Sequence, residues 1–326
     1  MANRTEITEL LNSYKTNGQD LIRRSYLSKL ANYTKRPTII YFSAFPAKIP
    51  APSAALSIDL SDLQGFMTCL NGLNDKNFDN DSLDLIIHSP GGSLEATEQI
   101  VQYLRAKFKS IRAIIPQNAM SAASMLACAC DEILLGKESA IGPIDPQITF
   151  PGANGVSTTM PAHAIIEDFK RATEDVKSNP NLAAIWAPKL LSIPHGLLYF
   201  CEKTEELSKE RVGEWLDSYM FKDDEIKKGR EIADWLARFD EHKTHGRPIN
   251  YDLAKCKGLK VKRLEDDPTL QDLVLSVYHA TLLTFDVTSC VKIVENHLGK
   301  GSYAIVNTPM ITQPIPVPVH PLDKKE

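Results

Sequence analysis

Two apolar segments separated by a helix-length stretch constrain the fold of this chain more than any other feature. Residues 83–88 and 111–116 are short, near-continuous apolar runs, and the residues 93–109 between them have helical spacing. A strand–helix–strand unit of this kind aligns its strands in parallel through a right-handed crossover and buries both faces of the sheet. The pattern therefore predicts an α/β fold.

The same alternation continues on both sides of this unit. Further strands are expected at residues 37–42 and 132–135, and further helices at 61–73, 121–130 and across most of 162–240. The small, polar residues 150–159 predict an exposed hairpin or flap. Repeated strand, turn and helix is typical of stacked βαβ units.

The two ends of the chain are expected to lie outside this core. Apolar residues recur at helical steps between residues 5 and 33, and again between 269 and 298, where one long helix is predicted. Five prolines within residues 308–321 exclude a helix and predict an extended tail. We therefore expect three parts: an N-terminal helical arm at 1–36, a core domain at 37–266, and a C-terminal helix with a Pro-rich tail at 267–326.

Composition argues against several classes of partner. Lys and Arg number 37 against 41 Asp and Glu, a net charge of -4, so no basic field exists to attract nucleic acid. No segment approaches the ~20 apolar residues that a membrane span requires, and the N-terminus has no apolar leader. The six cysteines lack the spacing of a zinc site or a disulfide framework. We expect a reduced, cytoplasmic protein without a metal site.

Two turns at strand ends carry the residues suited to chemistry. Residues 89–93, Ser-Pro-Gly-Gly-Ser, follow a strand and open a helix, which leaves bare N–H groups where an anion or a developing oxyanion binds. Ser121 stands at the start of the next helix, in a stretch of small residues, with Ser124 one turn further. Taken singly, the glycines also suit a structural turn, and either serine suits a helix cap.

Together with the sequences that follow, these elements resemble a known family. The strings HSPGG at 88–92, SAASM at 121–125, CDEI at 130–133 and IGPIDPQ at 141–147 resemble the Clp protease proteolytic subunit and signal peptide peptidase A. They are most similar to the serine dehydrogenase proteinases, over roughly residues 37–265. The resemblance implies a ClpP/crotonase-like fold with a nucleophilic serine at the start of the helix after the second strand.

The resemblance leaves two serines open as the nucleophile. The string Ala-Ala-Ser-Met matches that of the Clp protease at Ser124, whereas the spacing to Gly92 and to residues 131–133 favours Ser121, which we prefer. The oxyanion hole would then consist of backbone N–H groups of the Gly91-Gly92 turn, with Gly92 as the donor, and of Ala122, or of Met125 if Ser124 attacks.

The general base is less well defined, because no histidine follows near Asp145 at the position used by the Clp protease. The segment 242–248 corresponds to one that contributes the acidic member of that triad, and a histidine there suits proton transfer near neutral pH. We prefer His245, with Asp145 to orient it. The other candidates are His242 in the same segment, and His163, Lys170 and Lys177 by analogy with the lysine of signal peptide peptidase A.

The leading hypothesis is a cofactor-independent serine peptidase acting on protein or peptide substrates. The sequence has no Walker motif, so ATP-driven unfolding would need a separate partner. The resemblance further implies a homo-oligomer, as a trimer, hexamer or ring. Two alternatives keep the fold: an inactive scaffold or binding protein, and an acyl-CoA enzyme whose two amides would hold a thioester enolate.

Overall fold

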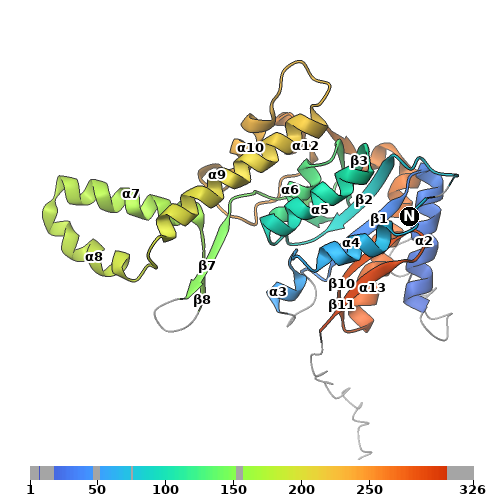
Figure 1. Ribbon diagram of the computed structural model, residues 1–326, viewed down its shortest axis with the longest axis horizontal. Coiled ribbons are helices and arrows are strands. Elements are labelled where there is room, and N and C mark those ends of the chain that lie inside the picture. The colour runs from blue at the N-terminus through green and yellow to red at the C-terminus, as the bar shows by residue number, and fades with distance from the viewer. Residues whose placement is uncertain (1–6, 8–17, 47–51, 75, 152–156, 307–326) are drawn as a thin grey trace, which may run out of the picture.

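A seven-stranded sheet forms the centre of the protein in a computed structural model that describes residues 7, 18–46, 52–74, 76–151 and 157–306 (Figure 1). The strand order is β11-β10-β1-β2-β3-β5-β9, and β1 through β9 in this order run parallel. The strands are β1 (Thr38–Ser43), β2 (Ser82–His88), β3 (Ser110–Ile115), β5 (Glu132–Leu135), β9 (Val261–Arg263), β10 (Cys290–Asn296) and β11 (Gly301–Ile305). The predicted α/β class is confirmed.

Helices cover both faces of this sheet (Figure 1). Side chains alternate between the faces, so Tyr41 enters one hydrophobic cluster and its neighbour Phe42 enters the other. The first face is covered by α4 (Asp62–Leu70), α5 (Leu94–Lys107) and α6 (Ala122–Cys128), and the second by α2 (Gly18–Thr34) and α13 (Pro268–Val287). The arm and the C-terminal helix expected from the sequence thus pack on the chain's own sheet.

The C-terminal region differs from the prediction of one helix over 269–298, because the helix ends at Val287. Residues 290–296 and 301–305 form an antiparallel hairpin, and β10 pairs with β1. Val291, Ile293 and Val294 are β-branched and alternate between the two hydrophobic clusters, which suits a strand inside a sheet. The Pro-rich tail and most of residues 1–17 lie outside the described residues.

A helical projection extends from one end of the sheet (Figure 1). It begins with a hairpin of β7 (Gln147–Pro151) and β8 (Ser157–Pro161), whose tip, the expected flap, falls largely outside the described residues. Helices α7 (Ala162–Ser178), α8 (Ala183–Leu191) and α9 (Leu197–Trp215) follow. Ile148, Ile165 and Leu197 belong to a separate small hydrophobic cluster, so the projection has its own core.

Shorter elements make up the rest of the secondary structure in the part of the chain that the structure describes. They are α3 (Ser53–Leu56), β4 (Asn118–Ala119), β6 (Ala140–Ile141), η1 (Pro180–Leu182), a π-helical turn η2 (Leu216–Met220), α10 (Gly229–Ala237), α11 (Phe239–His242), α12 (Tyr251–Cys256) and η3 (Leu264–Asp266). Within the described part of the chain, no helix is both long enough and apolar enough to cross a bilayer.

Candidate active site

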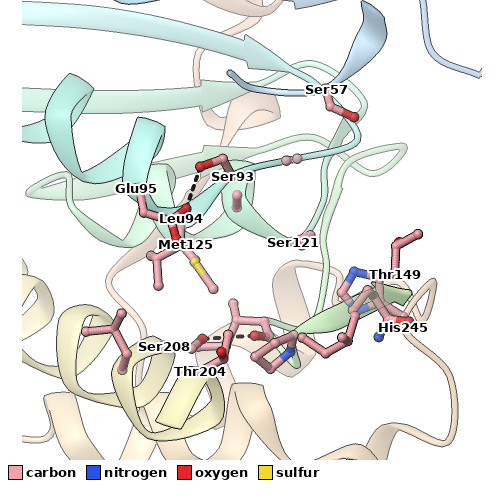
Figure 2. Close-up of a pocket in the computed structure, with 18 of the residues that line it drawn as sticks. Ser57, Ser93, Leu94, Glu95, Ser121, Met125, Thr149, Thr204, Ser208 and His245 are labelled. Atoms are coloured by element: carbon pink, nitrogen blue, oxygen red, sulfur yellow. Dashed lines mark hydrogen bonds between the residues drawn. The ribbon is translucent and has the colours of Figure 1, made fainter. Parts of the chain in front are cut away.

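The carboxyl ends of the parallel strands open onto a cavity of about 730 Å³. One wall carries the glycines after β2 and the serine before α6, and the opposite wall carries residues of β7, α9 and the loop with His245 (Figure 2). Open α/β sheets bind their ligands at this end of the strands. The two turns singled out in the sequence therefore meet at one cavity.

Ser121 occupies a strained turn between β4 and α6. Its φ of 52° and ψ of -123° lie in a region that residues other than glycine rarely adopt. Gly91 leaves room for this turn, because a Cβ there would lie 2.8 Å from the Ser121 Cβ. The serine does not cap its helix, and its hydroxyl has no hydrogen-bond partner among the described residues. A sharp strand-to-helix turn of this kind exposes the nucleophilic serine in α/β-hydrolases.

Two backbone N–H groups beside Ser121, those of Gly92 and Ala122, have no acceptor within the described ranges and line the cavity. The Ile58 N–H donates to Gly91 O (2.7 Å), and the Ile58 carbonyl accepts the Ser93 N–H (2.9 Å). Because these bonds turn the neighbours of Gly92 toward Ile58, the Gly92 N–H itself points the opposite way. Gly92 has a φ of 156°, and a Cβ there would lie 2.3 Å from Ile58 O. Only glycine fits this approach.

A histidine and an aspartate are paired across the cavity from the serine. His245 Nδ1 lies 2.8 Å from Asp145 Oδ1, and Gln147 Nε2 donates to the second carboxylate oxygen (2.8 Å). The Asp145 side chain is 2% exposed and that of His245 26%, so the imidazole lies at the border between core and cavity. Ile249 pairs with Ile141 through two backbone hydrogen bonds, and this contact brings the His245 loop to Asp145.

Ser121 and His245 line the same cavity without touching each other (Figure 2). No hydrogen bond joins the Ser121 hydroxyl to the imidazole, and Nε2 has no partner in the described part of the chain. With the proton on Nδ1, where the carboxylate accepts it, Nε2 carries the lone pair that faces the cavity. Hydrogen bonds between a nucleophile and its base are often long without substrate and tighten on binding.

The alternative nucleophile Ser124 is buried and already uses its hydroxyl in both directions. It donates to Ala119 O (2.7 Å) and accepts the Gly142 N–H (2.8 Å), so it joins β4 to the chain after β6. Met125, the oxyanion donor that would accompany it, donates its N–H to Ser121 O (3.1 Å) and presents only its side chain to the cavity. The geometry therefore favours Ser121.

The remaining candidate bases do not line this cavity. His242 is buried and donates from Nε2 to Trp235 O (2.9 Å), and burial lowers the pKa of its imidazole. His163 contacts Asp240 at 3.2 Å. On the projection, Lys170 is exposed and pairs with Glu167, and Lys177 lines a different groove, formed with α9.

Several residues of the site lack a local signal in the sequence. Ile58 aims the Gly92 N–H although it belongs to no motif. Phe200 and Leu207 on α9 form part of the apolar wall, but their helical spacing indicates only a packed helix. His88, at the end of β2, is buried and lies 2.6 Å from Phe45 O through Nε2. Sequence reasoning could have identified Gln147, because this residue belongs to the IGPIDPQ string that carries the family resemblance.

Serine hydrolases bring a nucleophile, a base and an oxyanion hole within reach of one carbonyl, and this cavity offers a candidate for each. The fold is thus an α/β fold whose cavity, at the carboxyl ends of the parallel strands, brings these candidate groups together. Over residues 73–280 the chain matches the family described as ClpP-like SDH-type serine proteinase. It belongs to this family, which confirms the resemblance predicted from the sequence.

Two proteins of Methanocaldococcus jannaschii, both described as uncharacterized, are similar to the chain. One is 32% identical over 179 residues, which cover 55% of this chain and 51% of the relative. The other is 31% identical over 180 residues, covering 55% and 53%. The chain thus spans about half the length of the curated relatives it matches.

A solved structure, that of a probable enoyl-CoA hydratase/isomerase from Mycobacterium abscessus, aligns over 73% of this chain and 76% of its own. The two share 14% sequence identity at a TM-score of 0.32. A likeness this distant says nothing about activity.

Proposed function

We propose that the protein is a serine peptidase in which Ser121 is the nucleophile, His245 the general base, and Asp145 the residue that orients it. The observation that carries this proposal is the His245–Asp145 pair, which leaves Nε2 directed at the cavity that Ser121 lines. Membership of a family of ClpP-like serine proteinases supports the same class of reaction.

The reaction follows from the positions of these groups. His245 Nε2 takes the Ser121 hydroxyl proton as Oγ attacks the carbonyl carbon, and the resulting imidazolium is stabilised by the Asp145 carboxylate. The oxyanion accepts hydrogen bonds from the N–H groups of Gly92 and Ala122. Collapse breaks the C–N bond, and His245 returns the proton to the departing amine. Water then hydrolyses the acyl-enzyme by the same steps in reverse order.

The substrate is proposed to be a protein or peptide. Leu94, Met125 and Leu207 give the cavity an apolar lining, while the unpaired amides on one wall suit a peptide carbonyl. No disulfide joins the chain's six cysteines, five of which are buried, which fits a reducing compartment. We therefore keep the cytoplasm as the proposed location.

Labelling with a fluorophosphonate probe, located by mass spectrometry, tests the nucleophile. We expect one adduct, on Ser121, and no adduct in Ser121→Ala. Turnover of a peptide substrate should fall by at least about 10³-fold in that variant, because attack requires the hydroxyl. Thr204→Ala is the matched control: this hydroxyl lies on the opposite wall of the same cavity and bonds to Phe200 O (2.8 Å) within its own helix, so labelling should match wild type.

Ser124→Ala separates the two candidate serines. An adduct on Ser124 in wild type, retained in Ser121→Ala, would contradict the assignment. If folded wild-type protein gave no adduct and cleaved no peptide, the scaffold reading would replace the hydrolase.

A further inference from the structure

The direction of the Gly92 N–H depends on a segment outside the cavity, residues 57–62. Ile58 makes both hydrogen bonds that fix the chain around Gly92, and the Ile58 backbone occupies the space where a Gly92 side chain would lie. A shift of Ile58 therefore moves Gly92 with it. The contacts that hold residues 57–62 in place therefore also set the position of the Gly92 N–H, the proposed oxyanion donor.

Lys292, on β10, holds this segment from the far end of the sequence. Its ammonium donates to Ser57 O (2.7 Å) and to the carboxylates of Asp59 (3.0 Å) and Asp62 (2.9 Å). Three acceptors use the three donors of an ammonium group. The Lys292 side chain is 4% exposed and that of Asp62 6%, so little water competes with these bonds.

Asp62 extends the same network to the segment itself and to the sheet. It accepts the Asp59 N–H (3.0 Å) and the Tyr41 hydroxyl (2.7 Å). Burial and the Asp62 carboxylate raise the pKa of Tyr41 well above its ordinary value, so its hydroxyl keeps the proton that it donates. Burial opposes the ionisation of Asp59, but hydrogen bonds from Ser61 and Lys292 hold its pKa below the usual range.

Stability alone gives no reason for a buried ion pair between Lys292 and Asp62. The neighbouring Val294 points to the same face of β10, into a hydrophobic cluster. Apolar side chains in place of both Lys292 and Asp62 would avoid the cost of removing two charges from water, and replacing both partners of a buried ion pair in this way is often neutral or stabilising. What only a cation supplies here is a set of directed hydrogen bonds to Ser57 O and to the two carboxylates.

We infer that Lys292 is a positioning residue for the oxyanion hole: through Ser57 and Ile58 it sets the direction of the Gly92 N–H. This inference rests on the proposed function. Lys292 lies behind the oxyanion strand and does not line the cavity, so it acts on the rate of attack and not on substrate contacts.

The test compares Lys292→Met with wild type in the rate of reaction with a fluorophosphonate. The phosphoryl oxygen of this probe occupies the oxyanion hole as Ser121 attacks, so its maximal rate of inactivation reports on that hole. We expect this rate to fall by about 10-fold to 100-fold, less than the 10²- to 10³-fold that complete removal of a donor causes. The concentration for half-maximal inactivation should stay within about twofold, because the cavity lining is intact.

Arg23→Met is the matched control for the loss of a buried cation. Arg23 pairs with Glu295 on the same strand (2.7 Å), but toward the opposite face of the sheet. The Arg23→Met variant should lose thermal stability, as Lys292→Met does, but it should react with the fluorophosphonate at the wild-type rate. Lys292→Arg, which retains a cation, should recover at least part of the rate that Lys292→Met loses.

If Lys292→Met does not fold, Asp59→Ala replaces it as the test variant. This carboxylate is 45% exposed, so its removal is tolerated more easily, and the rate should fall in the same direction by a smaller factor. A wild-type rate in folded Lys292→Met, or in Asp59→Ala where only that variant folds, overturns the inference and leaves the proposed function standing. An equal fall in Arg23→Met also overturns it. If wild-type protein does not react at Ser121, the proposed function fails and the inference fails with it.

Discussion

The backbone conformations of a few individual residues determine which chemistry this cavity can support. Ser121 is held at a positive φ, and that conformation persists because Gly91 has no side chain to collide with it. Gly92 is required for a different reason, the close approach of the Ile58 backbone. Sequence reasoning could find these three residues because glycine pairs and helix-start serines are local signals. It could not derive the contact between Asp145 and His245 from spacing, since 100 residues separate them; the resemblance suggested the pair, and folding brings it together.

His88 gives the protein a pH-dependent stability. Burial lowers the pKa of its imidazole from 6.5 to about 4, while hydrogen bonds with Phe45 and Asn118 act in the other direction. Because the unfolded chain takes up the proton first, His88 contributes its full stability above about pH 6.5, and this contribution is lost as the pH falls toward about 4. At pH 5 the loss amounts to about 2 kcal/mol.

Urea unfolding at pH 7.5 and pH 5 measures this loss. In His88→Gln the fall in the free energy of unfolding between the two pH values should shrink by about 2 kcal/mol. His195→Gln, at an exposed position, should keep the wild-type difference. An unchanged difference in His88→Gln would show that other groups carry the acid sensitivity.

At the scale of elements, local patterns identified β1, β2, β3 and β5 and the helices between them, and missed the strands at both edges of the sheet. Residues 290–296 continue the apolar periodicity of α13 closely enough to be assigned to one helix, and only pairing with β1 distinguishes them as a strand. The short β9 was missed for the same reason, because its three residues form a strand only through their pairing with β5. Tertiary pairing overrides local preference at both places.

Helices α9 and α10 meet at a contact that only glycine allows. A Cβ on Gly229 would lie 2.3 Å from Gly213 O and 2.7 Å from Asp217 Oδ1, which also accepts the Gly229 N–H (2.8 Å). We expect Gly229→Ala to lower the free energy of unfolding by about 1–3 kcal/mol, because the two helices must separate. Urea denaturation of the variant and of wild type measures this change in the free energy of unfolding.

Gly246→Ala is the control for this substitution. Its added Cβ would meet no atom within 4 Å, so the same chemical change should leave stability within about 0.5 kcal/mol of wild type. Equal stability of Gly229→Ala and wild type would show that the helices can adjust at no cost.

At the scale of the molecule, the helical projection leaves large apolar side chains uncovered. Ile185 is 69% exposed and Leu191 82%, both on α8, far from the sheet (Figure 1). Exposed apolar patches of this kind mark interaction surfaces. By contrast, α2 and α13 cover each other and the sheet. We propose that the protein forms a homo-oligomer and that the projection takes part in it.

Sedimentation velocity tests this proposal. Wild type should sediment as an assembly larger than one chain, and Ile185→Glu combined with Leu191→Glu should shift it toward smaller species, because burying two carboxylates in a contact is costly. Val287→Glu, at an exposed position on α13, should sediment as wild type. A wild-type monomer at micromolar concentration would rule the assembly out.

The place of β10 beside β1 has a consequence for biosynthesis. Of the strands described in this sheet, β1 leaves the ribosome first, and its partner β10 follows only after β2, β3, β5 and β9. Until residue 296 has emerged, the apolar β1 remains an open edge, and residues 57–62 lack Lys292. A nascent or truncated chain therefore holds Ser121 without the support behind its oxyanion strand. Under the proposed function, translation itself delays the peptidase until β10 has emerged and paired with β1.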